Sequence, residues 1–289
     1  AGPAFPSQWI FSASTVGQYN TPWSVSNMLP ATSGSSGYIS VVRGEANAGQ
    51  EFTRTVNSYK PAVSTMVEGD YWLYTLPVKR LEAGTAVEFD ATMAGEANSP
   101  KYFIVEYLDG GVWKSVEEDL LTAPEDPSIR YTYKCSGTAT GSGYQHASVM
   151  QTVRFADPVE GAVQIRCRAV GHYTCSGGTQ NISASSSASL LPPFGFSGSY
   201  VQNLGTAIPG DTKKVLCLGN SFSYYSNPAW MLKEIAWNEG HYLNVKGHFK
   251  GSQNFGQHLE LSFSTDAIDI GGYDYAFIQD QSQNPATYG

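Results

Sequence analysis

The sequence predicts a multi-domain chain: an all-β antiparallel sandwich of jelly-roll type over residues 1–205, followed over residues 212–289 by part of an α/β domain with a parallel sheet between layers of helices. In the first part, short apolar/polar alternations are separated by turn clusters, without helical periodicity. In the second part, strand and helix signals alternate as β-α-β-α-β, for which right-handed crossovers give a parallel sheet. A length of 289 residues with 41% hydrophobic content suffices for two cores.

Two segments of the first part alternate cleanly. In residues 85–93, Val, Phe, Ala and Met at odd positions should face inward, with Glu, Asp and Thr between them facing outward. Residues 161–170 repeat this pattern, and Asp109-Gly110-Gly111 suits a hairpin turn. Further strands are expected at residues 38–42, 62–67, 71–78, 101–108, 112–116, 130–134 and 147–155. This spacing favours a jelly-roll sandwich with almost no helix.

The boundary between the two parts is expected near residues 200–212. Residues 181–190 are rich in Ser and Ala, and residues 195–211 carry several Gly and Pro between two strongly patterned regions.

The second part opens on an apolar run at residues 214–218, which is typical of a central parallel strand. A Gly-Asn-Ser turn follows, and then a helix over residues 228–239, with Asn227 as cap, Pro228 at its first position and Gly240 after its end. A strand over 242–249, a short helix over about 254–261 and a strand over 273–278 complete the pattern.

The composition excludes several classes of function. Charged residues make up 15% of the chain, the net charge is −8, and the 17 Lys and Arg form no basic run, so we expect no nucleic-acid partner. No apolar run is long enough to span a membrane. Abundant Ser, Gly and Tyr with few Lys favour a secreted, periplasmic or cell-surface bacterial protein, whose numbering could begin after a removed export signal.

Four cysteines are present. Cys167 and Cys217 lie within apolar strand patterns and suit small buried hydrophobes. Cys135 and Cys175 each precede Ser-Gly at the end of a Tyr-containing strand, so they could form a disulfide in an oxidising compartment or remain thiols. No pair has zinc-site spacing and no acidic cluster suggests calcium, so we expect no metal and no cofactor.

In a parallel sheet the loops after the strands meet at one edge, where ligands bind. Here those loops carry Gly-Asn-Ser-Phe-Ser at 219–223, Gly251 with Gln257-His258 downstream, and Gln-Asp-Gln-Ser at 279–282. Together these blocks resemble the SGNH (GDSL-like) hydrolase superfamily, in its branch that reads Gly-Asn-Ser-Phe-Ser. The resemblance covers residues 214–289.

The resemblance implies that Ser221 is a nucleophile. It also implies an oxyanion hole built from the backbone N–H of Ser221, the backbone N–H of Gly251 and a side-chain amide after the third strand, supplied by Gln279 or Gln281. Such donors stabilise the charge that develops on the tetrahedral intermediate.

The chain departs from the family in two ways. No Asn follows the third strand directly, and no Asp-x-x-His block supplies a base. His248 and His258 are better interpreted as packing or surface residues, His241 lies at the opposite edge, and the remaining two histidines lie in the first part. We therefore expect that the chain, ending at Gly289, is part of a longer hydrolase and has little or no turnover by itself.

Two functions remain. The first is a secreted serine esterase acting on acyl or acetyl esters of carbohydrates, incomplete in this chain. The alternative is a non-catalytic carbohydrate-binding or cell-surface module with a degenerate hydrolase-like part. Either would take a carbohydrate or acylated glycan as partner, and the aromatic residues that could stack on sugars are Trp9, Trp23, Tyr71, Trp72 and Trp113.

Overall fold

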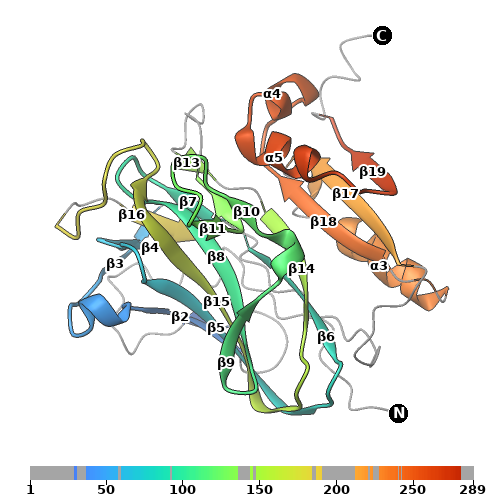
Figure 1. The fold of residues 1–289 in the computed structure, drawn as a ribbon, viewed down its shortest axis with the longest axis horizontal. Helices are drawn as coiled ribbons and strands as arrows, with labels where there is room; N and C mark the ends of the chain where they lie inside the picture. The colour runs from blue at the N-terminus through green and yellow to red at the C-terminus, as the bar shows by residue number, and fades with distance from the viewer. Residues whose placement is uncertain are drawn as a thin grey trace.

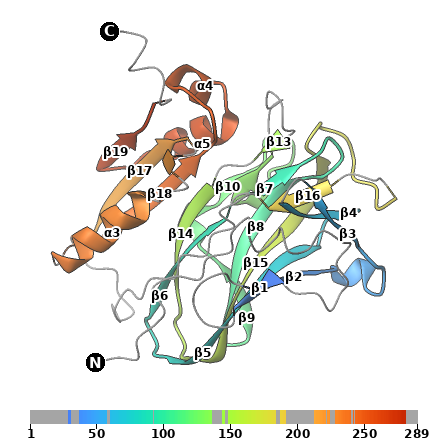
Figure 2. The ribbon, with the colours of Figure 1, turned by 180° about the vertical axis from the view of Figure 1, so that it is seen from behind.

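Two parts lie side by side in this computed structural model, a β-rich part and a smaller α/β part (Figures 1 and 2). The structure describes residues 29–30, 37–57, 60–91, 93–135, 144–145, 148–183, 187–190, 212–220, 222–223, 228–239, 241 and 243–280. Ser221 and Gln281 fall outside these residues. Within them, no helix is long and apolar enough to cross a membrane.

The first layer of the β-rich part is a seven-stranded antiparallel sheet. Its two longest strands pair with each other, and their register shifts at a bulge between Glu160 and Gly161. In order, the strands are β1 (Leu29–Pro30), β2 (Tyr38–Val42), β5 (Tyr71–Leu81), β15 (Val159–Thr174), β8 (Pro100–Asp109) and β12 (Tyr133–Lys134), and β9 (Val112–Ser115) pairs with β8. A separate two-stranded ribbon joins β10 (Leu121–Thr122) and β11 (Arg130–Tyr131).

The second layer is antiparallel too. It contains β13 (Tyr144–Gln145), β7 (Met93–Gly95), β16 (Ser187–Leu190), β4 (Lys60–Ser64) and β3 (Thr53–Asn57), together with the pair β14 (Ser148–Arg154) and β6 (Ala86–Ala91). Both layers contribute to one apolar core, in which the rings of Tyr74 and Phe89 meet edge to face at 5.1 Å between centroids. The predicted β-rich part with antiparallel sheets is therefore confirmed, and its two layers on one core fit a β-sandwich, whereas the jelly-roll connectivity stays a prediction.

Among the described residues before position 191, the helical segments are two 3-10 turns, η1 (Glu45–Asn47) and η2 (Glu117–Asp119). The inward residues predicted in segment 85–93 are all buried. This segment is nevertheless not one strand, because β6 and β7 join different sheets. Cys135 and Cys175 are both buried and carry free thiols, with Cys175 donating to the Pro100 carbonyl, so the structure contains no disulfide between them.

The α/β part has three parallel strands, with β17 (Lys213–Gly219) between β18 (Leu243–Phe249) and β19 (Tyr275–Ile278). Helix α3 (Pro228–Asn238) packs on one face through Ala229, which contacts an apolar cluster of β17 and β18. Helix α5 (Ser262–Ile270) packs on the other face through Ala267. Short α4 (Phe255–Leu259) precedes α5. The β-α-β-α-β succession is thus present, with α5 as an unpredicted addition.

β19 is the edge strand of this sheet and is poorly covered. Tyr275, Phe277 and Ile278 are 61%, 51% and 53% exposed. Paired residues of parallel strands point to the same side, so the Tyr275 and Phe277 side chains lie on the α3 face and Ile278 on the α5 face. Neither face of β19 is therefore closed by a helix among the described residues.

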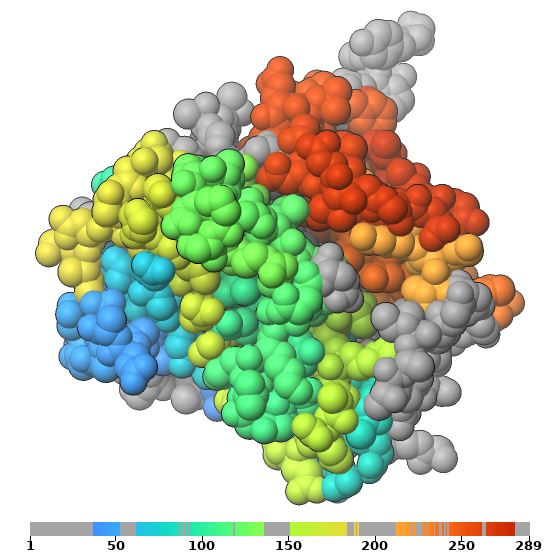
Figure 3. Space-filling view, in the orientation of Figure 1, coloured from blue at the N-terminus to red at the C-terminus, as the bar shows by residue number. Residues whose placement is uncertain are grey.

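The sandwich and the α/β part share a sheet of order β19-β17-β18-β14-β6. β14 pairs antiparallel with the end of β18, Ser148 opposite Phe249 and Val149 opposite His248. Figure 3 shows the orange and red α/β residues packed directly against the green residues of the sandwich. The sheet thus joins the two parts on either side of the predicted domain boundary near residues 200–212, which itself stays a prediction.

Polar contacts reinforce this junction. The Lys246 ammonium pairs with Asp119 of the sandwich, and both side chains are almost fully buried. Asp266 on α5 accepts hydrogen bonds from Tyr131 Oη at 3.2 Å and from Lys134 Nζ at 3.3 Å. Lys246 lies opposite Leu216, which packs against α5, so both contacts hold the α/β part to the sandwich on the face of the sheet that α5 covers.

Candidate functional site

The carboxyl ends of the three parallel strands form one polar edge. β17, β18 and β19 are followed directly by Asn220, Lys250 and Gln279. The Lys250 N–H donates to the Gly219 carbonyl and the Gln279 N–H to the Leu218 carbonyl, both at 2.9 Å. The sheet ladder thus extends one residue past β18 and β19, and the three loops begin side by side, as the parallel topology predicted.

Asn220 holds the first loop to the third. Its side chain is buried, and its Nδ2 donates to the Asp280 carbonyl at 3.0 Å. Its Oδ1 accepts from the Phe222 N–H at 3.1 Å, the local bond of an Asx turn. Asn220 therefore fixes both flanks of Ser221, although Ser221 itself lies outside the described residues and its role stays a prediction.

Gln279 forms the second link between these loops. Its Oε1 accepts the hydroxyl of Ser223, which leaves the Nε2 donors of the same amide for another acceptor. This bond passes directly over Gly219, where a Cβ would lie 2.9 Å from Ser223 Cβ and 3.2 Å from Gln279 Oε1. Glycine is needed here because of this close approach.

The loop after β18 is tied to the third loop as well. Gly251 accepts from Gln253 Nε2 at 3.2 Å, and Ser252 adopts a left-handed φ of 62°. Asn254 then forms a capping box with Gln257 at the start of α4. The Phe255 N–H donates to Asp280 Oδ1 at 3.1 Å. The structure thus brings Gly251 and Gln279 into one loop cluster, but their predicted oxyanion role is untested, and Gln281 lies outside the described residues.

His258 lies beneath this edge. It is 3% exposed, its Nδ1 hydrogen-bonds Ser264 Oγ of α5 at 2.9 Å, and its Nε2 has no hydrogen-bond partner among the residues that the structure describes. Burial lowers the pKa of the imidazole and the Lys250 ammonium lowers it further, while the Gly219 carbonyl and Asp280 act in the opposite direction. The ring is therefore neutral and surrounded by all three loops. The sequence could not predict this setting because Ser264, the partner of Nδ1, belongs to the unpredicted helix α5.

The other histidines lie elsewhere. His248 points from β18 toward the sandwich and is buried, and its pKa is lowered to about 3 by burial, by Lys246 and by His258. His241 precedes β18 at the opposite edge of the sheet, His172 belongs to β15, and His146 lies outside the described residues.

Among the described residues, no group of three or more His, Cys, Asp or Glu side chains could hold a metal ion.

The described candidate sugar-stacking residues lie on two faces of the seven-stranded sheet. Trp72 is fully buried in the core of the sandwich. Tyr71 and Trp113 are partly exposed and flank Arg166, whose guanidinium carbon lies 5.0 Å and 4.1 Å from the two ring centroids. Trp9 and Trp23 lie outside the described residues.

We predict that Gly219→Ala destabilises the protein by about 1–3 kcal/mol, because the added methyl group displaces Ser223 and breaks its bond to Gln279. Gly256→Ala is the control, since its Cβ would meet only Asn254 Oδ1 at 3.5 Å. Adding Ser223→Gly to Gly219→Ala should recover part of the loss. Urea unfolding of the unmodified chain, of Gly219→Ala, of Ser223→Gly and of the double variant measures this coupling, and strictly additive effects would contradict the close approach.

Acid should weaken the fold through His248. The imidazole of His248 has a pKa of about 3 in the folded chain and about 6.5 in the unfolded chain. Between these two pH values the unfolded chain binds one more proton than the folded chain, so the free energy of unfolding decreases as the pH falls. The loss is at most about 1.4 kcal/mol per pH unit. His248→Gln should flatten this dependence, whereas the exposed His241→Gln should not. The urea midpoint of each variant is measured from neutral to mildly acidic pH. If the midpoint falls equally with pH in His248→Gln and in the unmodified chain, His248 does not cause the pH dependence.

Comparison with known proteins gives little guidance. No protein-family model matches the chain, and no curated protein matches it. Among solved structures, the chain is similar to Xylanase10C from Cellvibrio japonicus in complex with xylopentaose, at 10% identity and a TM-score of 0.28. The match covers 85% of this chain and 44% of the xylanase chain, and at this TM-score it does not establish a common fold.

Proposed function

We propose that the protein is an ester hydrolase of SGNH type in which Ser221 attacks acyl or acetyl esters of carbohydrates. The observation that supports this most is the cross-linked edge of three parallel strands. Asn220, Gln279 and Asp280 tie together the loops that flank the proposed nucleophile. The Asx turn from Asn220 to Phe222 lies at the edge where such sheets bind ligands.

The same edge carries donors suited to an oxyanion. Negative charge moves to the carbonyl oxygen of the ester as Ser221 attacks. In this proposal that oxygen accepts hydrogen bonds from the backbone N–H of Gly251 and from the Nε2 of Gln279 or Gln281. Each such donor is worth roughly 3–4 kcal/mol of transition-state stabilisation. His258 acts in this proposal as a positioning residue, because its ring packs beside Gly219 and between the loops.

A serine hydroxyl also needs a general base, which the family provides through an Asp-x-x-His block absent from this sequence. We therefore expect slow turnover of a small activated acetyl ester, with an acetyl adduct on the peptide that contains Ser221. Ser221→Ala should abolish both the adduct and the hydrolysis above the uncatalysed rate, whereas the exposed control Ser128→Ala should retain them. Mass spectrometry of the peptide and an absorbance assay test this. Undiminished hydrolysis by Ser221→Ala, or no adduct in the unmodified chain, would exclude the nucleophile.

Carbohydrate binding without catalysis is the second candidate, and the outer face of the seven-stranded sheet favours it. There Glu106 accepts from Arg166 Nε at 2.6 Å and from Arg168 Nη2 at 2.7 Å, next to the rings of Tyr71 and Trp113. Partly exposed rings beside fixed polar groups are the elements with which proteins hold pyranose rings.

If this face binds sugar, Trp113→Ala should raise the Kd for polysaccharide about tenfold, since it removes a stacking surface. The Kd is obtained from how strongly the polysaccharide slows the protein in native gels. Val112→Ala is the matched control, because Val112 is 59% exposed on the same strand. Equal retention of both variants would exclude the face as the binding surface.

A further inference from the structure

The thiols of Cys135 and Cys175 meet at one end of the sandwich. Cys135 directly follows β12 and Cys175 directly follows β15. Both segments hydrogen-bond to residues 99–101, where β8 begins. The Cys135 N–H donates to the Lys101 carbonyl at 2.7 Å, and the Cys175 N–H donates to the Ser99 carbonyl at 2.9 Å. Two cysteines far apart in the sequence are therefore held beside the same short stretch of chain.

Both sulfurs lie against one glycine of the second layer. The Gly95 N–H of β7 donates to the Cys135 sulfur, and a Cβ placed on Gly95 would lie 3.2 Å from Cys175 Sγ. The Cys135 thiol also hydrogen-bonds to the Cys175 sulfur. Cys175 Sγ in turn donates to the Pro100 carbonyl at 3.3 Å. Two thiols in such contact need only a small side-chain movement to form a disulfide.

The other two cysteines have different surroundings. Cys167 lies within β15 opposite Trp72 of β5, and Cys217 lies within β17 opposite Phe277 of β19. Both thiols are buried, and this burial raises the pKa of each, that of Cys217 to about 12. Within the described part of the chain, which includes all four cysteines, a contact between thiols joins Cys135 to Cys175 alone.

Burial decides when a bond between these two sulfurs can form. In the folded chain Cys135 is fully buried and Cys175 is 6% exposed. Burial raises the pKa of the Cys135 thiol and the contact with Cys175 raises it further, while the Lys250 ammonium acts in the opposite direction. Because the thiolate is the reactive form, the folded thiols react slowly. Oxidation therefore belongs to the folding chain, and the finished bond is shielded from reducing agents.

We propose that Cys135 and Cys175 form a structural disulfide when the chain folds in the presence of a small-molecule or protein disulfide. The thiolate of one cysteine attacks the S–S bond of this oxidant, which forms a mixed disulfide and releases one thiol. The thiolate of the other cysteine then displaces the remaining half of the oxidant as a second thiol. The protein thus loses two hydrogens and two electrons, and the oxidant gains them.

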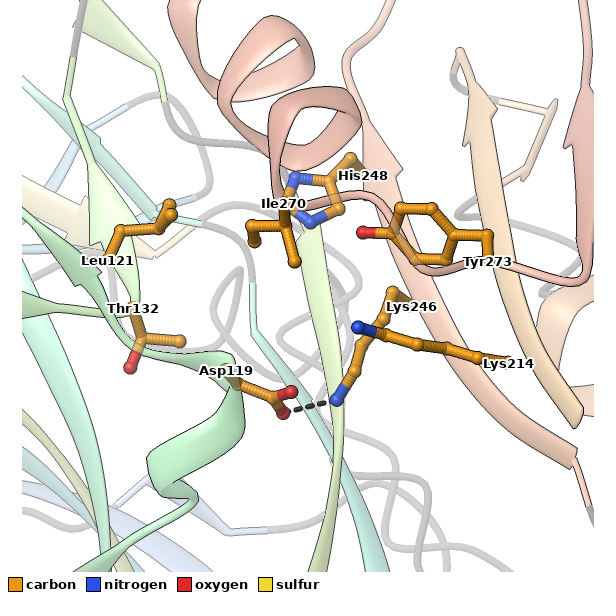
Figure 4. A pocket seen from close by; sticks show the side chains of 8 residues that line it. All are labelled: Asp119, Leu121, Thr132, Lys214, Lys246, His248, Ile270 and Tyr273. Carbon is orange, nitrogen blue, oxygen red and sulfur yellow. Dashed lines mark hydrogen bonds and ion pairs between the residues drawn. The ribbon is translucent and has the colours of Figure 1, made fainter. Parts of the chain in front are cut away.

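The bond would stabilise the side of the sandwich that carries the α/β part. Lys134 directly precedes it and donates to Asp266 of α5 at 3.3 Å. Figure 4 shows Thr132, from the same segment, on the sandwich side of the junction where Lys246 pairs with Asp119. The cross-link closes a loop of about 40 residues, which restricts the unfolded chain and so favours the folded one. It shares no residue with the loop cluster, so it is independent of the esterase proposal.

The test uses the intact chain, first reduced and then held just below its urea midpoint in oxidised glutathione, so that molecules open and refold repeatedly. A sample in reduced glutathione is the comparison. After the remaining thiols are alkylated in strong urea, peptide mass spectrometry should find Cys135 linked to Cys175, with Cys167 and Cys217 alkylated. With urea removed, the linked chain should unfold roughly 5–15 °C above the reduced chain, because its unfolded state is restricted.

Cys217→Ala is the matched control for Cys135→Ala, because each removes one nearly fully buried thiol. Cys217→Ala should keep the link and the difference in unfolding temperature between the two buffers, and Cys135→Ala should lose both. The intact chain decides even where a variant fails to fold. The proposal is overturned if the oxidised chain keeps four free thiols, if another pair is linked as abundantly, or if the link leaves the unfolding temperature unchanged or lowers it.

Discussion

The antiparallel pairing of β14 with β18 is the interaction on which the α/β part depends. Three parallel strands with a bare edge on each side would leave backbone groups unpaired and apolar faces uncovered. The pairing of Ser148 with Phe249 and of Val149 with His248 covers one end of one of these edges. It does so at the carboxyl end of β18, directly before Lys250 and Gly251, so the sandwich also helps to place the second loop of the candidate site.

The junction is polar as well as apolar, and this has an energetic reason. Lys233, Lys246 and Lys250 are each at most 5% exposed. A buried ammonium is tolerated when it is paired or hydrogen-bonded, and Lys246 meets Asp119 while Lys233 Nζ donates to Thr152 Oγ1 at 2.7 Å. Such contacts add little net stability compared with apolar packing, but removing one partner is costly, so they select one arrangement of the two parts.

The sequence predicted what depends on local pattern and missed what depends on distant partners. β2 lies at the predicted residues 38–42, because alternation identifies a half-buried strand. α5 was missed, because its Ser, Thr and Asp residues favour caps and turns in isolation. Parallel topology predicted that Gly219 and Gln279 would lie at one edge. The bonds of Asn220 to Asp280 and of Ser223 to Gln279 span about 60 positions, and no local pattern encodes them.

The weak cover of β19 means that the loop cluster can be assembled and dismantled at small cost. Gln279 and Asp280 are carried by a strand that is exposed on both faces and paired on one side. Backbone hydrogen bonds that are poorly shielded open locally at free energies well below global unfolding. When β19 frays, Asn220 and Ser223 lose their partners together. The hydrogen bonds that hold Asn220 and Ser223 therefore depend on how stably β19 pairs with β17.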